Sequence, residues 1–246
     1  MDQEEGRVLA LLAFNTDRIV PTCLIAQELW SDGPLPHTDS RVVSHIASVR
    51  RLLSSMADAE LLTSAPGGYR LDSSGWILDA HRFERDLGAG FRAMAAGDAA
   101  RAAERLYGAL SLWKGEVLAG LPQGAVLRSY TRRLEQSRAT ALEQWAATEL
   151  QLGRHRERLG ELGVFAARYA SHQGLHKHYI RALLRCGRTV EALRVYERLN
   201  LALRREGSTE MSLELLRLRR RIVSAAGDLR EGSTGLPLRR SSPAFG

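Results

Sequence analysis

The sequence predicts a mainly α protein, with a winged helix-turn-helix domain followed by an all-helical, tetratricopeptide-like domain. Three helical segments and a glycine-rich hairpin occupy the first 73 residues, and amphipathic helical segments fill most of the rest. Two of the turns between these segments, at Gly153 and Gly187, lie 34 residues apart, which is the tetratricopeptide period. We therefore expect a winged helix-turn-helix domain at 1–73, a helical domain at 76–226 and a flexible tail at 227–246.

The first two helices precede a break that contains two prolines. An apolar run over residues 7–14 predicts the first helix. Thr22 is a plausible cap for the second helix, whose apolar residues 24, 25, 29 and 30 share one face. Gly33, Pro34 and Pro36 then end this helix, because proline cannot continue it.

The third helix, over residues 38–53, carries one apolar stripe and one polar face. The stripe repeats at helical spacing and predicts the buried side; it consists of Val42, Val43, Ile46, Val49, Leu52 and Leu53. The opposite side carries short polar residues and arginines, with Arg50 beside it. We expect this side to face outward.

A short hairpin follows the third helix. Residues 61–64 and 69–71 predict two strands, and Pro66, Gly67 and Gly68 form the turn. In a winged helix, the third helix enters the DNA major groove and the hairpin, or wing, reaches the flanking backbone or minor groove. The predicted DNA-contacting residues are Thr38, Arg41, Ser44, His45, Ser48, Arg50, Arg51, Tyr69 and Arg70.

Several of these residues have a second interpretation that does not involve DNA. Thr38 is a natural helix cap, a role compatible with a phosphate contact. His45 can pack against the preceding helix, and Tyr69 is more typical of wing packing than of a phosphate contact. The pair Arg50 and Arg51 can also be a solvated helix face.

Between residue 74 and the tail, the sequence predicts only helices. The expected segments are 79–96, 98–113, 126–152, 155–170, 175–186, 189–205 and 211–225. Similar turns recur at Gly97-Asp98, Gly153-Arg154 and Gly187-Arg188. Stacked helical hairpins of this kind bury their apolar faces against each other and present a concave surface to a partner.

The net charge does not by itself indicate DNA binding. The 246 residues carry a formal charge of +7, but six arginines, no lysine and ten acidic residues give residues 1–72 a charge of −4. The remaining residues carry about +11, nearly all of it as arginine. A GC-rich coding bias accounts for that composition equally well, so the local pattern has to carry the prediction.

Other classes of protein are disfavoured. Cys23 and Cys186 are far apart, and the histidines His172, His176 and His178 lack a carboxylate or cysteine to complete a ligand set, so no metal site is expected. No phosphate loop, nucleophile elbow or dinucleotide motif is present, so we predict neither catalysis nor a cofactor. The apolar run at residues 8–14 is too short to span a membrane, and the acidic start is unlike a signal peptide. A cytoplasmic protein is expected.

Short stretches along nearly the whole chain match one family in order and spacing. They are Leu9-Ala10-Leu11-Leu12, Arg18-Ile19-Val20-Pro21, Leu29-Trp30, Val49-Arg50-Arg51-Leu52-Leu53, Gly67-Gly68-Tyr69-Arg70-Leu71, Asp79-Ala80-His81-Arg82-Phe83, Ala109-Leu110-Ser111-Leu112-Trp113-Lys114-Gly115, and Gly187-Arg188 with Glu191-Ala192-Leu193. In these stretches the chain resembles the Streptomyces antibiotic regulatory protein (SARP) family. The resemblance implies a response-regulator-type winged helix followed by a bacterial transcriptional activation domain.

The resemblance also implies a function. Such activators bind tandem direct repeats in double-stranded promoter DNA as a homodimer and recruit RNA polymerase holoenzyme, through its sigma factor or alpha subunit. The genes they control belong to secondary-metabolite (antibiotic) biosynthetic clusters. No membrane partner is implied.

The chain departs from the family pattern at two places. The chain starts almost at the first helix, where the family has a small N-terminal sheet, so this sheet is expected to be missing, either because the start of the chain is shortened or because the sheet is truly absent. Ala65 stands where the wing often carries an arginine, which predicts weaker minor-groove reading and leaves Arg70 as the main wing contact. The acidic first domain and the missing sheet suggest, as the alternative, a helical-repeat protein-interaction module with a vestigial winged helix.

Overall fold

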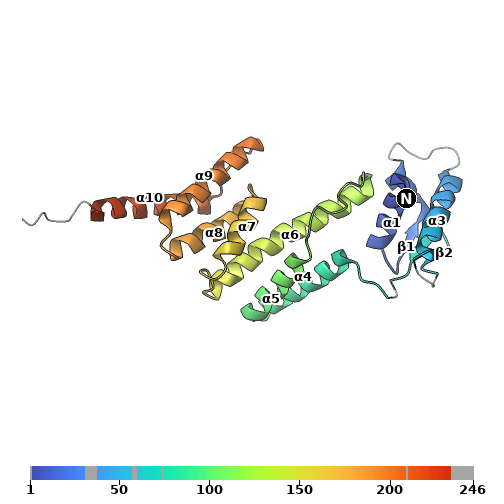
Figure 1. Cartoon of the computed structure of the whole chain (residues 1–246), viewed down its shortest axis with the longest axis horizontal. Helices are drawn as coiled ribbons and strands as arrows, with labels where there is room; N and C mark the ends of the chain where they lie inside the picture. Colours follow the sequence, from blue (N-terminus) through green and yellow to red (C-terminus); the bar gives the residue numbers. More distant parts are fainter. Residues whose placement is uncertain (1, 31–37, 57–59, 74, 209, 234–246) are drawn as a thin grey trace, which may run out of the picture. The chain divides into compact units, whose positions relative to one another are not determined.

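A computed structural model describes residues 2–30, 38–56, 60–73, 75–208 and 210–233 (Figure 1). The chain forms two compact units, residues 1–141 and 142–246, and the boundary between them falls inside one long helix. The break predicted around Gly33, Pro34 and Pro36 lies outside the described residues.

The first unit opens with the elements of a winged helix. These are α1 (Gln3–Phe14), β1 (Ile19–Pro21), α2 (Thr22–Leu29), α3 (Thr38–Ser54), β2 (Leu62–Ala65) and β3 (Gly68–Leu71). Helix α1 begins one turn before the apolar run, because Asp2 and Glu5 form a capping box at its start. Thr22 does not cap α2 as expected. It is the first residue of that helix, and its backbone N–H donates to the carbonyl of Gly67 at 3.1 Å.

The sequence analysis missed one strand of the sheet. Strand β1 pairs antiparallel with β3, giving a three-stranded sheet in the order β1-β3-β2 with Val20 opposite Tyr69. A strand of three residues leaves almost no alternating pattern to detect. Gly68 lies where β1 crosses closely, since a Cβ there would collide with the backbone carbonyl of Val20.

The core of the winged helix includes a residue from much later in the chain. Its buried residues are Val8, Leu11, Leu12, Val20, Ile25, Leu29, Val42, Ile46, Val49, Leu62, Leu71 and Leu127. Leu127 belongs to α6 (Ala125–Gln151), and Val126 and Tyr130 of the same helix also pack against this core. Val43, predicted to be buried, is 53% exposed. The start of α6 therefore completes the hydrophobic core around α1, α2 and α3.

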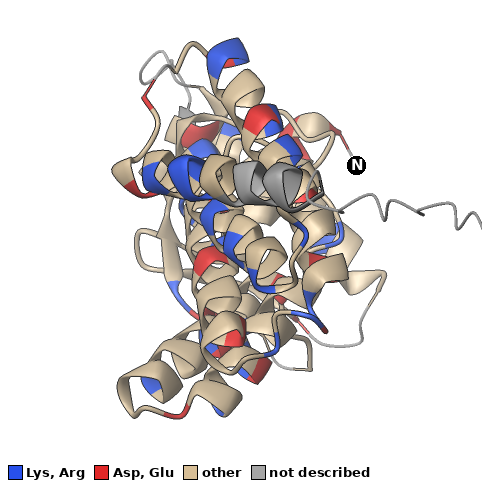
Figure 2. Cartoon of the chain, turned by 90° about the vertical axis from the view of Figure 1, so that its left-hand side faces the viewer, with Lys and Arg blue, Asp and Glu red and all other residues tan. Residues whose placement is uncertain are grey.

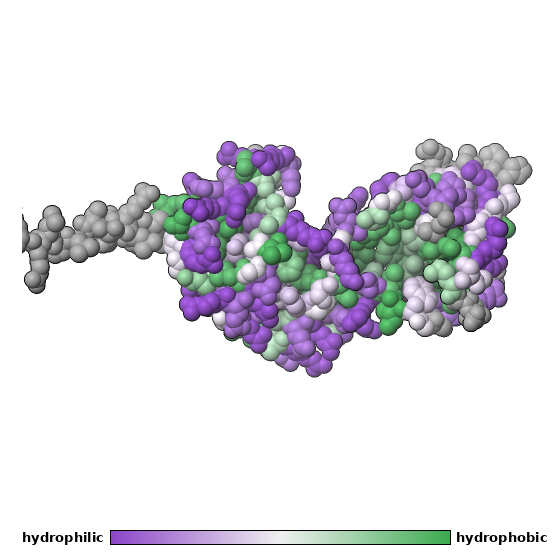
Figure 3. Space-filling view, in the orientation of Figure 1, coloured by the Kyte–Doolittle hydropathy of each residue, from purple (hydrophilic) through white to green (hydrophobic). Residues whose placement is uncertain are grey.

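The apolar side of α1 is only partly covered. Leu9, Ala10, Ala13 and Phe14 are half-buried, and a hydrophobic area lies over this helix in the space-filling view (Figure 3).

The remaining elements are all helices. They are α4 (Asp79–Ala95), α5 (Ala99–Ser111), α6, α7 (Leu159–Arg168), α8 (Gln173–Arg185), α9 (Thr189–Arg205) and α10 (Leu213–Ser233). Helix α7 is shorter than expected. Helix α8 starts before Gly174, and a Cβ at that position would collide with the Glu143 carboxylate. Helix α10 runs to Ser233, into the segment 227–246 predicted as a tail; residues 234–246 lie outside the described residues.

Four of the turns between helices share one backbone geometry. Gly97, Gly153, Gly187 and Gly207 all have positive φ, between 74° and 77°. The residue after each glycine donates its N–H to a carbonyl five residues earlier, as Arg188 does to Leu183 at 2.9 Å. This is the Schellman motif, which satisfies carbonyls at a helix end and favours glycine. The sequence predicted the first three turns and missed the fourth, at Gly207.

Candidate nucleic-acid interface

Helix α3 presents one face to the core and the other to solvent. Val42, Ile46 and Val49 are almost fully buried. The exposed residues of the helix include Ser40, Arg41, Val43, Ser44, Ala47 and Arg51. The spacing of residues 43, 44, 47 and 51 puts them on one side of the helix. The outward face therefore includes Val43 and Ala47, which sequence reasoning did not propose as contacts.

The two apolar residues suit a chemical role in base reading. Small apolar side chains in the major groove contact the C5-methyl group of thymine. The sequence spacing already placed Val43 on the same side of the helix as Ser44 and Ala47. However, Val43 also fits the edge of the apolar stripe, so the pattern alone could not separate the two interpretations.

Two predicted arginines remain exposed on α3. The Arg41 guanidinium lies over the Trp30 ring, 4.3 Å from its centroid, in a cation–π contact. Arg51 donates from Nη2 to the Ser48 hydroxyl at 3.1 Å. These contacts restrict both side chains while leaving most of their N–H groups open to solvent.

His45 faces the neighbouring helices. Its Nε2 lies 3.0 Å from the Glu4 carboxylate on α1, and its ring lies 6.2 Å from that of Trp30. Only 17% of the His45 side chain is exposed. The packing interpretation therefore describes His45 better than the outward one.

Arg50 connects the helix to the wing. Its Nε donates to the carbonyl of Leu62 at 3.0 Å, and its Nη2 donates to the Ser64 hydroxyl at 3.2 Å. Both partners belong to β2, and Glu60 lies 4.0 Å away. The guanidinium thus fixes the hairpin relative to α3.

The wing places its two predicted residues differently. Arg70 is exposed on β3, whereas Tyr69 is half-buried and packs against the core. Gly67 forms the turn with a φ of +79°. Thr38 is the first residue of α3, the position where backbone N–H groups can meet a phosphate.

A buried carboxylate joins the helix-turn-helix to α6. The Glu28 side chain, on α2, is fully buried and accepts hydrogen bonds from the backbone N–H groups of Gly124 and Leu127, the latter at 2.9 Å. It also pairs with Arg7 of α1, whose Nε is 3.3 Å away. A negative charge at a helix N-terminus satisfies free N–H groups and complements the helix dipole. Glu28 therefore caps α6 from a position 96 residues earlier in the chain.

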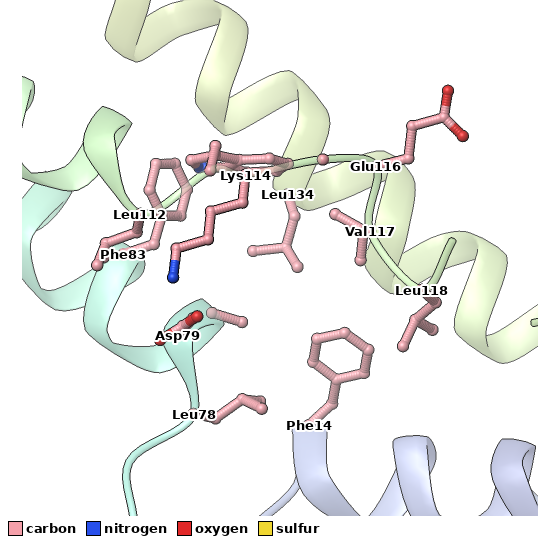
Figure 4. A pocket seen from close by; sticks show the side chains of 13 residues that line it. Phe14, Leu78, Asp79, Phe83, Leu112, Lys114, Glu116, Val117, Leu118 and Leu134 are labelled. Atoms are coloured by element: carbon pink, nitrogen blue, oxygen red, sulfur yellow. The ribbon is translucent and has the colours of Figure 1, made fainter. Parts of the chain in front are cut away.

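Aromatic and polar contacts extend this junction. The Phe14 and Tyr130 rings stack with centroids 5.5 Å apart, and the Tyr130 hydroxyl donates to the Asn15 side-chain oxygen at 2.9 Å. Beside them lies a cavity of about 280 Å³ with mainly apolar walls, among them Phe83 and Leu134 (Figure 4). Lys114 and Asp79 add charged groups to its lining (Figure 4).

The three clustered histidines have individual structural surroundings. His172 caps α8, accepting at Nδ1 from the backbone N–H of Leu175 at 3.0 Å. Burial lowers the pKa of His176, and burial lowers the pKa of His178 to about 4. Across the described ranges, no group of three or more His, Cys, Asp or Glu residues is placed to hold a metal ion. Cys23 and Cys186 are both free thiols.

Within the part of the chain that the structure describes, no helix has the length and apolar character needed to cross a membrane.

Two family models match the chain. Residues 78–223 match the bacterial transcriptional activator domain, and residues 1–71 match the C-terminal domain of transcriptional regulatory proteins. Regulatory protein DnrI of Streptomyces peucetius is 33% identical over 226 residues, which cover 89% of this chain and 83% of DnrI. The chain belongs to the Streptomyces antibiotic regulatory protein family. The predicted family is thus confirmed, and this SARP-family protein is a transcriptional regulator.

Other relatives are longer proteins. Regulatory protein AfsR of Streptomyces coelicolor is 31% identical over 93% of this SARP chain, which spans only 23% of AfsR. A solved structure of Mycobacterium tuberculosis EmbR, in complex with a low-affinity phosphopeptide, superposes with a TM-score of 0.74 at 26% identity. The match covers 95% of this chain and 65% of that one. The predicted fold class, a winged helix followed by a tetratricopeptide-like helical domain, is confirmed.

Proposed function

We propose that this protein is a sequence-specific DNA-binding activator whose helix α3 reads the major groove. The observation that carries the proposal is the division of α3 into a buried face and an exposed face of short side chains with an arginine. In the proposed complex, Val43, Ser44, Ala47 and Arg51 face the base edges, because these residues lie on the exposed side. Such a face meets the steric requirement of a recognition helix.

Phosphate contacts complete the interface in this proposal. Arg41 at one end of α3 and Arg70 on the wing are exposed cations, and Thr38 marks the helix N-terminus. Arg50 serves as a positioning residue, because its hydrogen bonds to β2 set the wing against the helix. His45 holds α3 on α1 and does not need to touch DNA.

The small number of cations argues for binding as a dimer. A winged helix of net negative charge with few phosphate contacts binds weakly and loses affinity with salt. Two protomers on tandem direct repeats gain affinity from their effective concentration. We expect a tandem site to bind at least roughly tenfold more tightly than a single half-site.

The rest of the proposal concerns the whole activator. A DNA-binding domain at 1–73 positions the protein on promoter DNA in the cytoplasm, and the helical domain at 76–226 recruits RNA polymerase holoenzyme through its sigma factor or alpha subunit. The target genes belong to an antibiotic biosynthetic cluster. The SARP resemblance supports these assignments.

A footprint across the gene's own genomic neighbourhood would find the operator, and a mobility-shift assay would then test the interface. The double variant Arg41→Ala/Arg51→Ala should lose specific binding while its helicity stays unchanged. The matched control Arg101→Ala/Arg132→Ala removes two exposed arginines of the same unit outside α3 and should bind normally. Unchanged promoter occupancy in the α3 variant would reject the proposal and favour the helical-repeat interaction module with a vestigial winged helix.

A further inference from the structure

A groove in the second unit gathers positive charge. Helices α6, α8 and α10 border a cavity of about 540 Å³ that three arginines line: Arg181 and Arg185 from α8, and Arg221 from α10. The other lining residues are neutral, namely Ala147, Leu150, Gln151, His178 and Leu184. No carboxylate is among the described residues that line this basic groove. The helix that leads into the grey trace in Figure 2 is α10, and its first half is rich in arginine.

The three arginines differ in their contacts. Arg185 donates from Nη1 to the backbone carbonyl of Leu150 at 2.7 Å, which fixes its guanidinium against α6 and leaves its other N–H groups for a ligand. The Arg181 guanidinium lies 3.9 Å from the Glu214 carboxylate. Arg221 is exposed on α10.

The charge of the basic groove comes from these guanidinium groups. His178 is buried beside them, and burial together with the charges of Lys177 and Arg181 lowers its pKa to about 4, although Glu143 and Glu214 act in the opposite direction. Its imidazole is therefore neutral near pH 7. It contributes ring surface to the wall, as Leu150 and Leu184 contribute apolar surface.

We propose that the basic groove binds an acidic peptide segment of a partner protein that carries both carboxylates and apolar side chains. Guanidinium groups bind carboxylates in bidentate pairs, and the apolar wall residues accept aliphatic side chains. Packed helices lie roughly 8–10 Å apart, and a DNA duplex is wider than this spacing. A duplex could therefore contact only the rim of the basic groove. The inference rests on the proposed function, because an activator that recruits polymerase needs a surface that binds polymerase. The proposed partner of the basic groove is therefore an acidic segment of RNA polymerase.

The test measures peptide binding by fluorescence anisotropy with the full chain. The probe is a fluorescein-labelled peptide of repeated Glu-Glu-Leu, and a Gln-Gln-Leu peptide of equal length is its uncharged counterpart. Arg185→Glu/Arg221→Glu should weaken binding of the acidic peptide at least roughly tenfold. The control Arg194→Glu/Arg205→Glu, with the same charge change at exposed positions of α9, should stay within about twofold of the wild type. Arg221→Glu alone retains the Arg185 contact with α6 and should still show a clear loss.

Transcription and DNA binding then separate the outcomes. The groove variant should occupy its operator normally but activate transcription several-fold less than the control variant. Equal peptide affinity in the two double variants would overturn the proposal, since binding would then follow net charge alone. Loss of operator affinity in the groove variant but not in the control variant would also overturn the proposal, because it would show that the groove binds nucleic acid. If instead the wild type occupies no operator, the proposed function fails, whereas the anisotropy result still decides the groove.

Discussion

Arg50 and Arg51 are neighbours in the sequence with different surroundings in the structure. Arg50 is hydrogen-bonded to two groups of β2, whereas Arg51 donates to the Ser48 hydroxyl of its own helix. A hydrogen bond from a charged donor contributes about 1.5–3 kcal/mol, and an exposed contact on one helix contributes much less. Substitution of Arg50 should therefore lower stability, whereas substitution of Arg51 should lower operator affinity.

The first prediction compares these two residues. Arg50→Ala should lower the free energy of unfolding by about 1–3 kcal/mol, because the Leu62 carbonyl loses its partner and the wing loses its support. Arg51→Ala should leave stability within about 0.5 kcal/mol and lower operator affinity. Urea unfolding and mobility shifts on the same preparations measure both quantities. A large stability loss in the Arg51 variant would contradict this division.

The second prediction concerns pH and His178. Burial lowers its folded-state pKa to about 4 from the ordinary 6.5, so the unfolded chain binds the proton more readily below pH 6.5. The resulting stabilisation is complete above pH 6.5 and is lost as the pH falls toward 4. Over that range the loss can reach about 3 kcal/mol for this group. The pKa of His176 is lowered as well, so its effect has the same sign.

Unfolding of the full chain in urea at pH 7.5 and at pH 5 measures this effect. His178→Gln should show a smaller difference between the two pH values than the wild type, because its side chain does not titrate. Equal pH dependence in the two proteins would show that other groups are responsible.

At the residue scale, the sequence predicted which amino acids lie on α3 but not what each one contacts. His45 and Arg50 look alike in the helical pattern, as polar residues away from the apolar stripe. Their partners, Glu4 and the β2 backbone, belong to elements that approach α3 only after folding. Helical spacing carries no information on such long-range neighbours.

At the scale of elements, the helix turns were the most predictable feature. A glycine followed by a polar residue between two amphipathic segments indicates a Schellman ending, and three of the four turns were found in this way. Strand β1 and the cap by Glu28 were missed, since both depend on partners distant in sequence.

The third prediction tests one of these turns. Gly187→Ala forces a side chain into the left-handed region, at a φ of 74°, and should lower the free energy of unfolding by about 1–2 kcal/mol. Gly160→Ala is the control, because Gly160 is helical and its added Cβ would meet open space. The control should be neutral or stabilising by up to about 1 kcal/mol. Equal losses in both variants, measured by urea unfolding, would refute the role of the turn.

At the scale of the whole molecule, the winged helix depends on chain beyond its own motif. Leu127 is fully buried in its core, and the Glu28 carboxylate finds its backbone partners at the start of α6. The sequence motifs gave no indication of this dependence, because they place the winged helix and α6 in separate domains.

The fourth prediction follows from this dependence. A fragment of residues 1–73 should unfold at lower urea concentration than a fragment of residues 1–141, because it lacks Leu127 and leaves the Glu28 carboxylate without its N–H partners. The loss of one buried leucine and of a satisfied carboxylate amounts to at least about 3 kcal/mol. Circular dichroism of both fragments in urea measures it, and equal midpoints would show that the first 73 residues are self-sufficient.

The contact between Glu28 and Gly124 also limits how this protein can be recombined with its relatives. A Cβ at position 124 would overlap the Glu28 backbone carbonyl and carboxylate, so the acid on α2 and the glycine before α6 form a matched pair. A chimaera that takes its DNA-reading half from one relative and its helical half from another separates the two. Transfer of this chain's winged helix onto another helical domain therefore requires a crossover point that keeps the pair together, or the transfer of both residues at once.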